Sequence, residues 1–91
     1  METPRSPEEA LVRARAAHLS YVDELMRKAN VVGVGVGLFR KGGGSRLETG
    51  LVVLVTHKVP RVQLAPGDLI PAEIDGVRVD VQEVGEIRAH R

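Results

Sequence analysis

The sequence contains no cysteine and no tryptophan, and its only aromatic residues are one tyrosine and one phenylalanine. The absence of cysteine excludes disulfide scaffolds, thiolate zinc sites, iron–sulfur clusters and cysteine nucleophiles. Because aromatic residues make up only 2% of the chain, a core must be built from valine, leucine, isoleucine and alanine. No apolar run approaches the roughly 18–20 residues that a membrane-spanning helix needs. These absences predict a cytoplasmic protein without a membrane partner.

The chain also lacks an excess of charge of one sign. Thirteen Lys and Arg residues stand against twelve Asp and Glu residues, which gives a formal net charge of +1. Nucleic-acid binding needs a basic face or stacking aromatic side chains, so we expect no nucleic-acid partner. A chain of 91 residues that is 43% hydrophobic and 27% charged is typical of one small globular domain. We therefore expect a single domain over residues 1–91, with a tail at residues 1–5.

A helix is predicted over residues 6–29. Ser6 can accept a hydrogen bond from the amide of Glu9, Pro7 suits the first helical position, and Asn30 is expected to end the helix. An apolar stripe at helical spacing is expected to face the core. This stripe consists of Val12, Ala16, Leu19, Val22 and Met26, widened by Leu11, Leu25 and Ala29.

The pattern changes to period two after the helix and predicts strands over residues 31–40, 49–59 and 77–84. Glycines mark a turn between the first two strands, and three prolines mark an irregular crossing segment over residues 60–71. Asp75-Gly76 predicts a tight turn. This order predicts an α+β domain, in which one long N-terminal helix packs on a small, mostly antiparallel three-stranded sheet. The first two strands should form a hairpin. The sequence pattern does not decide which strand pairs with the third.

The predicted core combines one face of the helix with one face of each strand. In such a core, Leu19→Ala should lower the stability by about 2–4 kcal/mol. The core residues are Val12, Leu19, Val22, Met26, Val34, Val36, Val53, Val55, Val79 and Val81.

No motif indicates catalysis or cofactor binding. The glycines of residues 33–37 follow G-x-G-x-G inside a strand, whereas dinucleotide binding needs G-x-G-x-x-G at a strand-to-helix turn. His18, His57 and His90 lack metal-ligand spacing, and no serine is placed beside a histidine and an acid by local spacing. We expect no enzyme, catalytic residue, cofactor, metal or small-molecule ligand. We also expect no hydrolysis of peptides or esters, and an activity that Ser45→Ala or His57→Ala abolishes would contradict this.

Residues 30–88 carry three motifs in order: NVVGVGVG, LVVLVTHKVP and LIPAEIDGVRVDVQEVGEI. They resemble the N-terminal segment of bacterial proteins in the Nal1-like group of trypsin-like serine peptidases, where similar strands precede a double-barrel protease core. In that group the catalytic His, Asp and Ser lie downstream, and His57 does not match the catalytic histidine motif. The resemblance implies a free-standing accessory or assembly module, or a piece of a longer peptidase, and it carries no catalytic residue onto this chain.

Two function classes follow from these observations: a non-catalytic structural or interaction module, and the N-terminal part of a peptidase. The predicted second strand is apolar on both faces, yet one helix covers only one face of a sheet. The uncovered face should therefore meet a second copy, another protein, or residues 60–71 of the same chain. We expect a homo-oligomer or protein docking, with an interface at Gly33, Gly35, Gly37, Val52 and Leu54.

Overall fold

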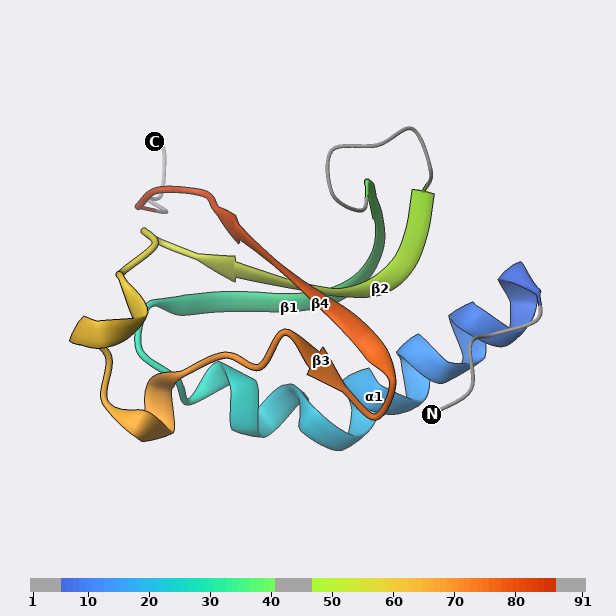
Figure 1. Cartoon of the computed structure of the whole chain (residues 1–91), viewed down its shortest axis with the longest axis horizontal. Coiled ribbons are helices and arrows are strands. Elements are labelled where there is room, and N and C mark those ends of the chain that lie inside the picture. Colours follow the sequence, from blue (N-terminus) through green and yellow to red (C-terminus); the bar gives the residue numbers. More distant parts are fainter. Residues whose placement is uncertain (1–5, 41–46, 87–91) are drawn as a thin grey trace, which may run out of the picture.

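The computed structural model describes residues 6–40 and 47–86, and in them one long helix lies along one face of a four-stranded sheet (Figure 1). Two short 3-10 helices lie near the C-terminal end of the helix, and the smallest strand runs beside the helix at the edge of the sheet. The elements are α1 (Pro7–Met26), β1 (Val31–Arg40), β2 (Leu47–Val55), η2 (Arg61–Gln63), η3 (Pro66–Asp68), β3 (Glu73–Ile74) and β4 (Val77–Glu83).

The α+β class and the β1–β2 hairpin are confirmed, but the sheet is not a three-stranded antiparallel one. Its strand order is β1-β2-β4-β3, and β2 pairs with β4 in parallel. The chain between β2 and β4 crosses back to the start of β2, so both strands run in the same direction. Within this crossing, β3 pairs with β4 across the predicted Asp75-Gly76 turn, where both residues have positive φ, as the tightest hairpin turns require.

The predicted start of α1 is confirmed. The Ser6 hydroxyl accepts a hydrogen bond from the Glu9 amide at 3.1 Å, and Pro7 occupies the first turn. The helix ends at Met26 rather than at residue 29. The residues that follow it make contacts with the crossing segment between β2 and β4 instead of continuing the helix. There, the Lys28 Nζ donates to the Gly67 carbonyl at 2.8 Å.

Asn30 lies in the left-handed region with a φ of 69°, between the end of α1 and β1. Asparagine is tolerated in this region better than alanine because its short polar side chain can hydrogen-bond to the local backbone, so Asn30→Ala is expected to lower the free energy of unfolding by about 1 kcal/mol. Asn30→Gly loses the same side chain but has no Cβ to strain the left-handed conformation, so it should leave the stability close to that of the wild type. Urea denaturation of the three proteins measures the difference. Equal losses in both variants would show that the backbone conformation is not what Asn30 provides.

The predicted second strand, residues 49–59, is displaced toward the N-terminus. β2 begins at Leu47 and ends at Val55, because the residues after it leave the sheet. The Lys58 amide donates to Glu83 Oε1 at 2.7 Å instead of extending the ladder. β4 ends at Glu83, one residue before the predicted end of the third strand.

A β-bulge at Val32 changes which side chains of β1 enter the core. Val31 pairs with Val55 and Gly33 with Leu54, so Val32 is the extra residue. Val31 is therefore buried, in the place that alternation assigned to Val32. Beyond the bulge the alternation holds, and Val34 and Val36 pack against the core as predicted. Of the other predicted core residues in the sheet, Val53, Val55 and Val79 are buried and Val81 packs against them.

The helix is rotated relative to the prediction. Its buried residues are Ala14, Ala17 and Leu25, and Tyr21 packs beside them. Small alanine side chains let the helix axis approach the valine surface of the sheet closely, and this close contact selects the alanine-rich face. Three of the four helix residues in the predicted core are therefore exposed, which corrects the prediction, and the fourth, Val22, is half-buried. The exposed fractions are 65% for Val12, 80% for Leu19 and 42% for Met26.

Candidate functional site

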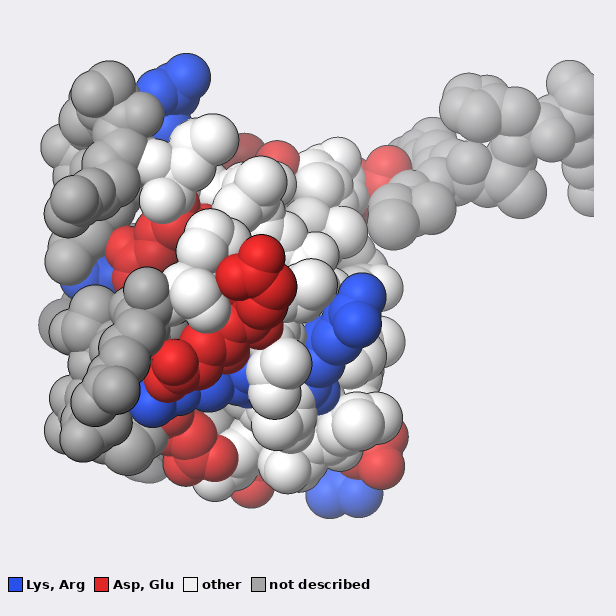
Figure 2. Space-filling model, turned by 90° about the vertical axis from the view of Figure 1, so that its right-hand side faces the viewer, with Lys and Arg blue, Asp and Glu red and all other residues white. Residues whose placement is uncertain are grey.

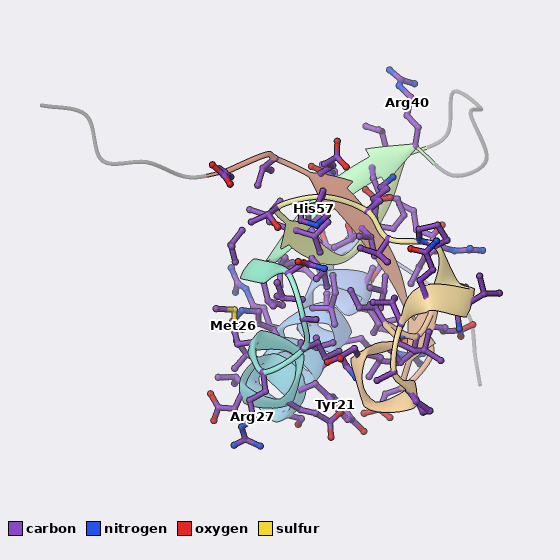
Figure 3. The ribbon with its side chains drawn as sticks, turned by 90° about the vertical axis from the view of Figure 1, so that its left-hand side faces the viewer. Tyr21, Met26, Arg27, Arg40 and His57 are labelled. Carbon is purple, nitrogen blue, oxygen red and sulfur yellow. The ribbon has the colours of Figure 1, made fainter. Side chains whose placement is uncertain are left out.

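The outer face of α1 carries the largest exposed apolar side chains of the helix. Val12, Leu19 and Met26 are spaced seven residues apart, so successive members deviate by only about 20° around the helix. Ala16, which is also exposed, lies between the first two. Figure 3 shows Met26 pointing sideways from the end of α1, toward the outside of the molecule. We call these four residues the outer stripe.

Two exposed charged residues flank the outer stripe. Arg15 lies on one side of Leu19 and Asp23 on the other, each four positions away along the chain. Neither has a hydrogen-bond or ion-pair partner among the residues that the structure describes, whereas Arg13 is paired with Glu9 at 3.0 Å. The stripe therefore has an apolar centre and charged flanks of opposite sign, a composition that suits helix–helix association.

The five residues of the predicted sheet interface lie together on the face that α1 leaves uncovered. Gly33 pairs with Leu54 and Gly35 pairs with Val52. These residues alternate along the strands with the core-facing valines, so they lie on the opposite face of the sheet. This face is less flat than the glycines suggest. A Cβ at Gly33 would lie 3.3 Å from Leu54 Cδ1, and one at Gly37 would lie 3.0 Å from Val52 Cγ2, so side chains of β2 already occupy that space. Only at Gly35, among these three glycines, is the space open.

The crossing segment between β2 and β4 does not cover this sheet face. Asp68 accepts a hydrogen bond from the Ala29 amide at 3.0 Å, and Ile70 packs against the core, which ties the segment to the C-terminal end of α1. Val62, at the tip of η2, is 93% exposed. The alternative in which residues 60–71 of the same chain cover this sheet face is therefore not adopted.

A small cavity of about 270 Å³ lies where this segment meets the end of α1. Three of its polar side chains make contacts within the fold: Asp68 accepts from the Ala29 amide, Arg61 Nη1 donates to the Ile70 carbonyl at 3.4 Å, and His57 Nδ1 lies 3.2 Å from Thr56 Oγ1. A pocket of this size is at the lower end for small-molecule sites. Sequence reasoning missed it because its lining comes from distant segments. The lining comprises Ala29, Asn30, Val55, His57, Lys58, Val59, Arg61, Leu64, Asp68, Ile70 and Val81.

The candidate catalytic side chains are dispersed. His18 Nε2 lies 3.0 Å from the Val34 carbonyl oxygen, which fastens α1 to β1, and His57 lies at the exposed end of β2. Ser6 caps the helix, and Ser20 is exposed on α1. Ser45 and His90 lie outside the described residues. In residues 6–40 and 47–86, no three His, Asp or Glu side chains form a group that could hold a metal ion.

Tyr21 is held by a polar contact at the edge of α1. Its hydroxyl donates to Asp75 Oδ1 at 3.3 Å, and the negative charge of Asp75 raises the pKa of Tyr21 above its usual value. The hydroxyl is therefore a weaker acid than a free tyrosine, and it links α1 to the β3–β4 turn. This is a structural contact rather than an activated proton donor.

The surface charges do not form a continuous patch of one sign on the face shown in Figure 2, where acidic and basic side chains are interspersed with uncharged ones. No helix in the described part of the chain is both long and apolar enough to cross a membrane.

The outer stripe is the candidate site with the most exposed apolar side chains, ahead of the open sheet face and the cavity. Its chemistry is that of a contact surface, because it presents no nucleophile or metal ligand at its centre. Comparison with protein-family models, with curated proteins and with solved structures gave no match.

Proposed function

We propose that this protein is a non-catalytic interaction module that self-associates through apolar surface left uncovered by its own fold, chiefly the outer stripe of α1. The observation that carries this proposal is the exposure of Leu19, at 80%, in the same stripe as Val12 and Met26. The buried face of the same helix uses two alanines and one leucine. The helix thus leaves three of its six Val, Leu and Met side chains exposed and buries only one of them fully.

The energetics support a contact role for this surface. Burying a valine, leucine or methionine side chain contributes roughly 1.5–3 kcal/mol relative to leaving it exposed. A domain of this size has a small net stability, so several unburied side chains are a substantial unused contribution. Contact with another protein surface would remove the stripe from water and recover that free energy.

The open sheet face is a second contact surface within the same proposal. Gly35 leaves room for a close approach, and Val52 and Leu54 add apolar area. These two side chains are half-buried already, so association there would remove less apolar area per residue than at Leu19. We therefore rank the sheet face behind the outer stripe.

The second candidate function is an accessory module of a trypsin-like serine peptidase. It is favoured by the position of the three motifs of residues 30–88, whose valine-rich parts fall on β1, β2 and β4, neighbouring strands of one sheet. Such a module would contact the protease core and contribute no catalytic group. A G-D-S-G-like segment in the adjoining coding sequence is the expected finding for this candidate, and its absence there would argue for the first.

The self-association proposal predicts the mass in solution. Light scattering after size-exclusion chromatography should give a mass above that of one chain at micromolar concentration. Leu19→Lys should weaken association at least about tenfold, since a charge would replace the centre of the apolar contact. Val62→Lys is the matched control, because Val62 is also highly exposed but lies on η2, away from α1.

Two results would contradict the proposal. A wild-type mass of one chain throughout the micromolar range would remove self-association. Equal weakening by Leu19→Lys and Val62→Lys would remove the outer stripe as the contact. Circular dichroism of each variant confirms that the fold is retained before the masses are compared.

A further inference from the structure

We infer that the cavity between the end of α1 and the crossing segment binds a small apolar carboxylate. The hydrocarbon part of this ligand fills the cavity, and its carboxylate lies at the rim against Lys58 and Arg61. No residue of the outer stripe lines this cavity, so the inference goes beyond the proposed self-association. It is carried by two cationic side chains that line an apolar cavity and form no ion pair with any described residue.

Apolar residues from separate parts of the chain form the walls of the cavity. Val55 and Val81 come from the neighbouring strands β2 and β4, and Leu64 and Ile70 come from the crossing segment. All four are buried or half-buried, so the cavity is set into the fold. A ligand that removes these walls from water must itself carry a hydrocarbon part. The polar lining residues are Asn30, His57, Lys58, Arg61 and Asp68.

The volume of the cavity limits the size of the ligand. An apolar cavity of about 150 Å³ holds one benzene molecule. The volume here is about 270 Å³, which leaves room for a benzene ring with a short side chain, or for a fatty chain of similar volume. Drug-sized ligands occupy pockets of about 300–1,000 Å³, so they are too large.

The charged side chains around the cavity select an anionic head group. Asp68 accepts a hydrogen bond from the Ala29 amide at 3.0 Å. Glu83, which is not part of the lining, accepts one from the Lys58 amide at 2.7 Å. Both acidic side chains are therefore already bonded to backbone N–H groups, whereas Lys58 and Arg61 are exposed and lack an acidic partner in the described part of the chain. The cations, rather than the acids, are available to a ligand.

The hydrogen-bonding groups of these two cations specify a carboxylate. Lysine and arginine side chains carry N–H donors and no acceptor. Arg61 Nη1 donates to the Ile70 carbonyl at 3.4 Å, which holds the guanidinium beside the cavity wall and leaves its other N–H groups without a partner among the described residues. A carboxylate supplies two acceptor oxygens and matches a guanidinium in bidentate geometry. His57 also lies at this end of the molecule, which faces the viewer in Figure 3.

Isothermal titration calorimetry with sodium octanoate and sodium 3-phenylpropionate tests the ligand class, the first with a chain and the second with a ring. The two corresponding amides are the matched neutral ligands. We expect at least one of the carboxylates to bind, and to bind about tenfold more tightly than its amide, because charge-assisted hydrogen bonds are the stronger ones. The amide NMR signals that shift most on titration should belong to the cavity residues.

Three variants test the site. Arg61→Gln should weaken carboxylate binding about fivefold to tenfold and remove most of the preference over the amide, because the bidentate contact is lost. Arg27→Gln is the matched control, since Arg27 is exposed at the end of α1, does not line the cavity and points away from the sheet in Figure 3. Leu64→Trp places a larger side chain in the cavity and should abolish binding of carboxylates and amides alike. Circular dichroism confirms that each variant is folded.

Four results would overturn the inference. They are no binding of either carboxylate at millimolar concentration, equal affinity for each carboxylate and its amide, equal weakening by Arg61→Gln and Arg27→Gln, and undiminished binding by folded Leu64→Trp. None of these results bears on self-association, because the outer stripe takes no part in the cavity. A protein that stays monomeric would likewise leave the carboxylate site standing.

Discussion

Leu25→Ala is expected to lower the free energy of unfolding by about 2–5 kcal/mol, the range for removing a fully buried leucine side chain. Leu25 is completely inaccessible to solvent, in the core formed by α1 and the valines of the sheet. Because the total stability of a domain this size is small, such a loss is severe, and we expect the variant to be partly unfolded at room temperature. The effect comes from lost apolar contacts and the cavity left in a packed interior.

Leu19→Ala is the matched comparison, because the same substitution occurs in the same helix with the same change in helix propensity. Leu19 is mostly exposed, so its loss should change the stability of the monomer by less than about 0.5 kcal/mol. This small expected change supersedes the loss of about 2–4 kcal/mol that the apolar pattern alone predicted for Leu19→Ala. Both variants are compared with the wild type by urea denaturation, at a concentration where every chain is monomeric.

The pair of leucine variants also tests the orientation of α1. A large loss for Leu19→Ala with a small one for Leu25→Ala would mean that the outer stripe, and not the alanine face, packs on the sheet. The proposed contact surface would then be part of the core, and self-association through it would be impossible.

Gly50→Ala is expected to cost about 1–3 kcal/mol or to prevent folding, because the new Cβ has no space. Gly50 is buried in β2, where a Cβ would overlap the Arg78 carbonyl oxygen of β4 and lie 2.9 Å from Cε1 of Phe39. The first contact is with backbone, so relief requires a shift of β4 relative to β2. This displacement would disturb the parallel pairing that joins the hairpin to the rest of the sheet.

Gly35→Ala is the control, since a Cβ at Gly35 meets no atom within 4 Å. It should leave the free energy of unfolding unchanged or raise it by about 0.5 kcal/mol, because alanine restricts the unfolded chain more than glycine does. Thermal unfolding followed by circular dichroism compares the two glycine variants with the wild type. If Gly50→Ala were as stable as Gly35→Ala, the close approach of β4 and Phe39 to Gly50 would be wrong.

The glycines of β1 and β2 have a structural explanation in these contacts. Leu54, Val52 and Phe39 occupy the space beside Gly33, Gly37 and Gly50, respectively. The glycine-rich strand therefore accommodates side chains of the same sheet face, as expected where a neighbouring group approaches the backbone closely. This use of glycine differs from phosphate binding, which needs amide groups at the start of a helix.

Local chemistry in the sequence determined where α1, β1 and β4 begin and how the strands alternate beyond the bulge. Ser6 and Pro7 start the helix through contacts within one turn, and Asp75-Gly76 reverses the chain through backbone conformations of its own residues. Alternation grouped the five residues of the predicted sheet interface on one face, because successive side chains of a strand point to opposite sides. These features depend on residues close in sequence, so they could be read without the fold.

The tertiary structure decided the pairing of β2 with β4, the bulge at Val32 and the rotation of α1. The helix has two faces that could enter the core, one lined by alanines with Leu25 and one by the outer stripe. Periodicity favoured the stripe because its side chains are larger. Which face packs inward depends instead on how closely the helix approaches the valine surface of the sheet, and the small alanines permit the closer approach. Val12, Leu19 and Met26, which sequence analysis placed in the core, therefore lie in the candidate contact surface instead.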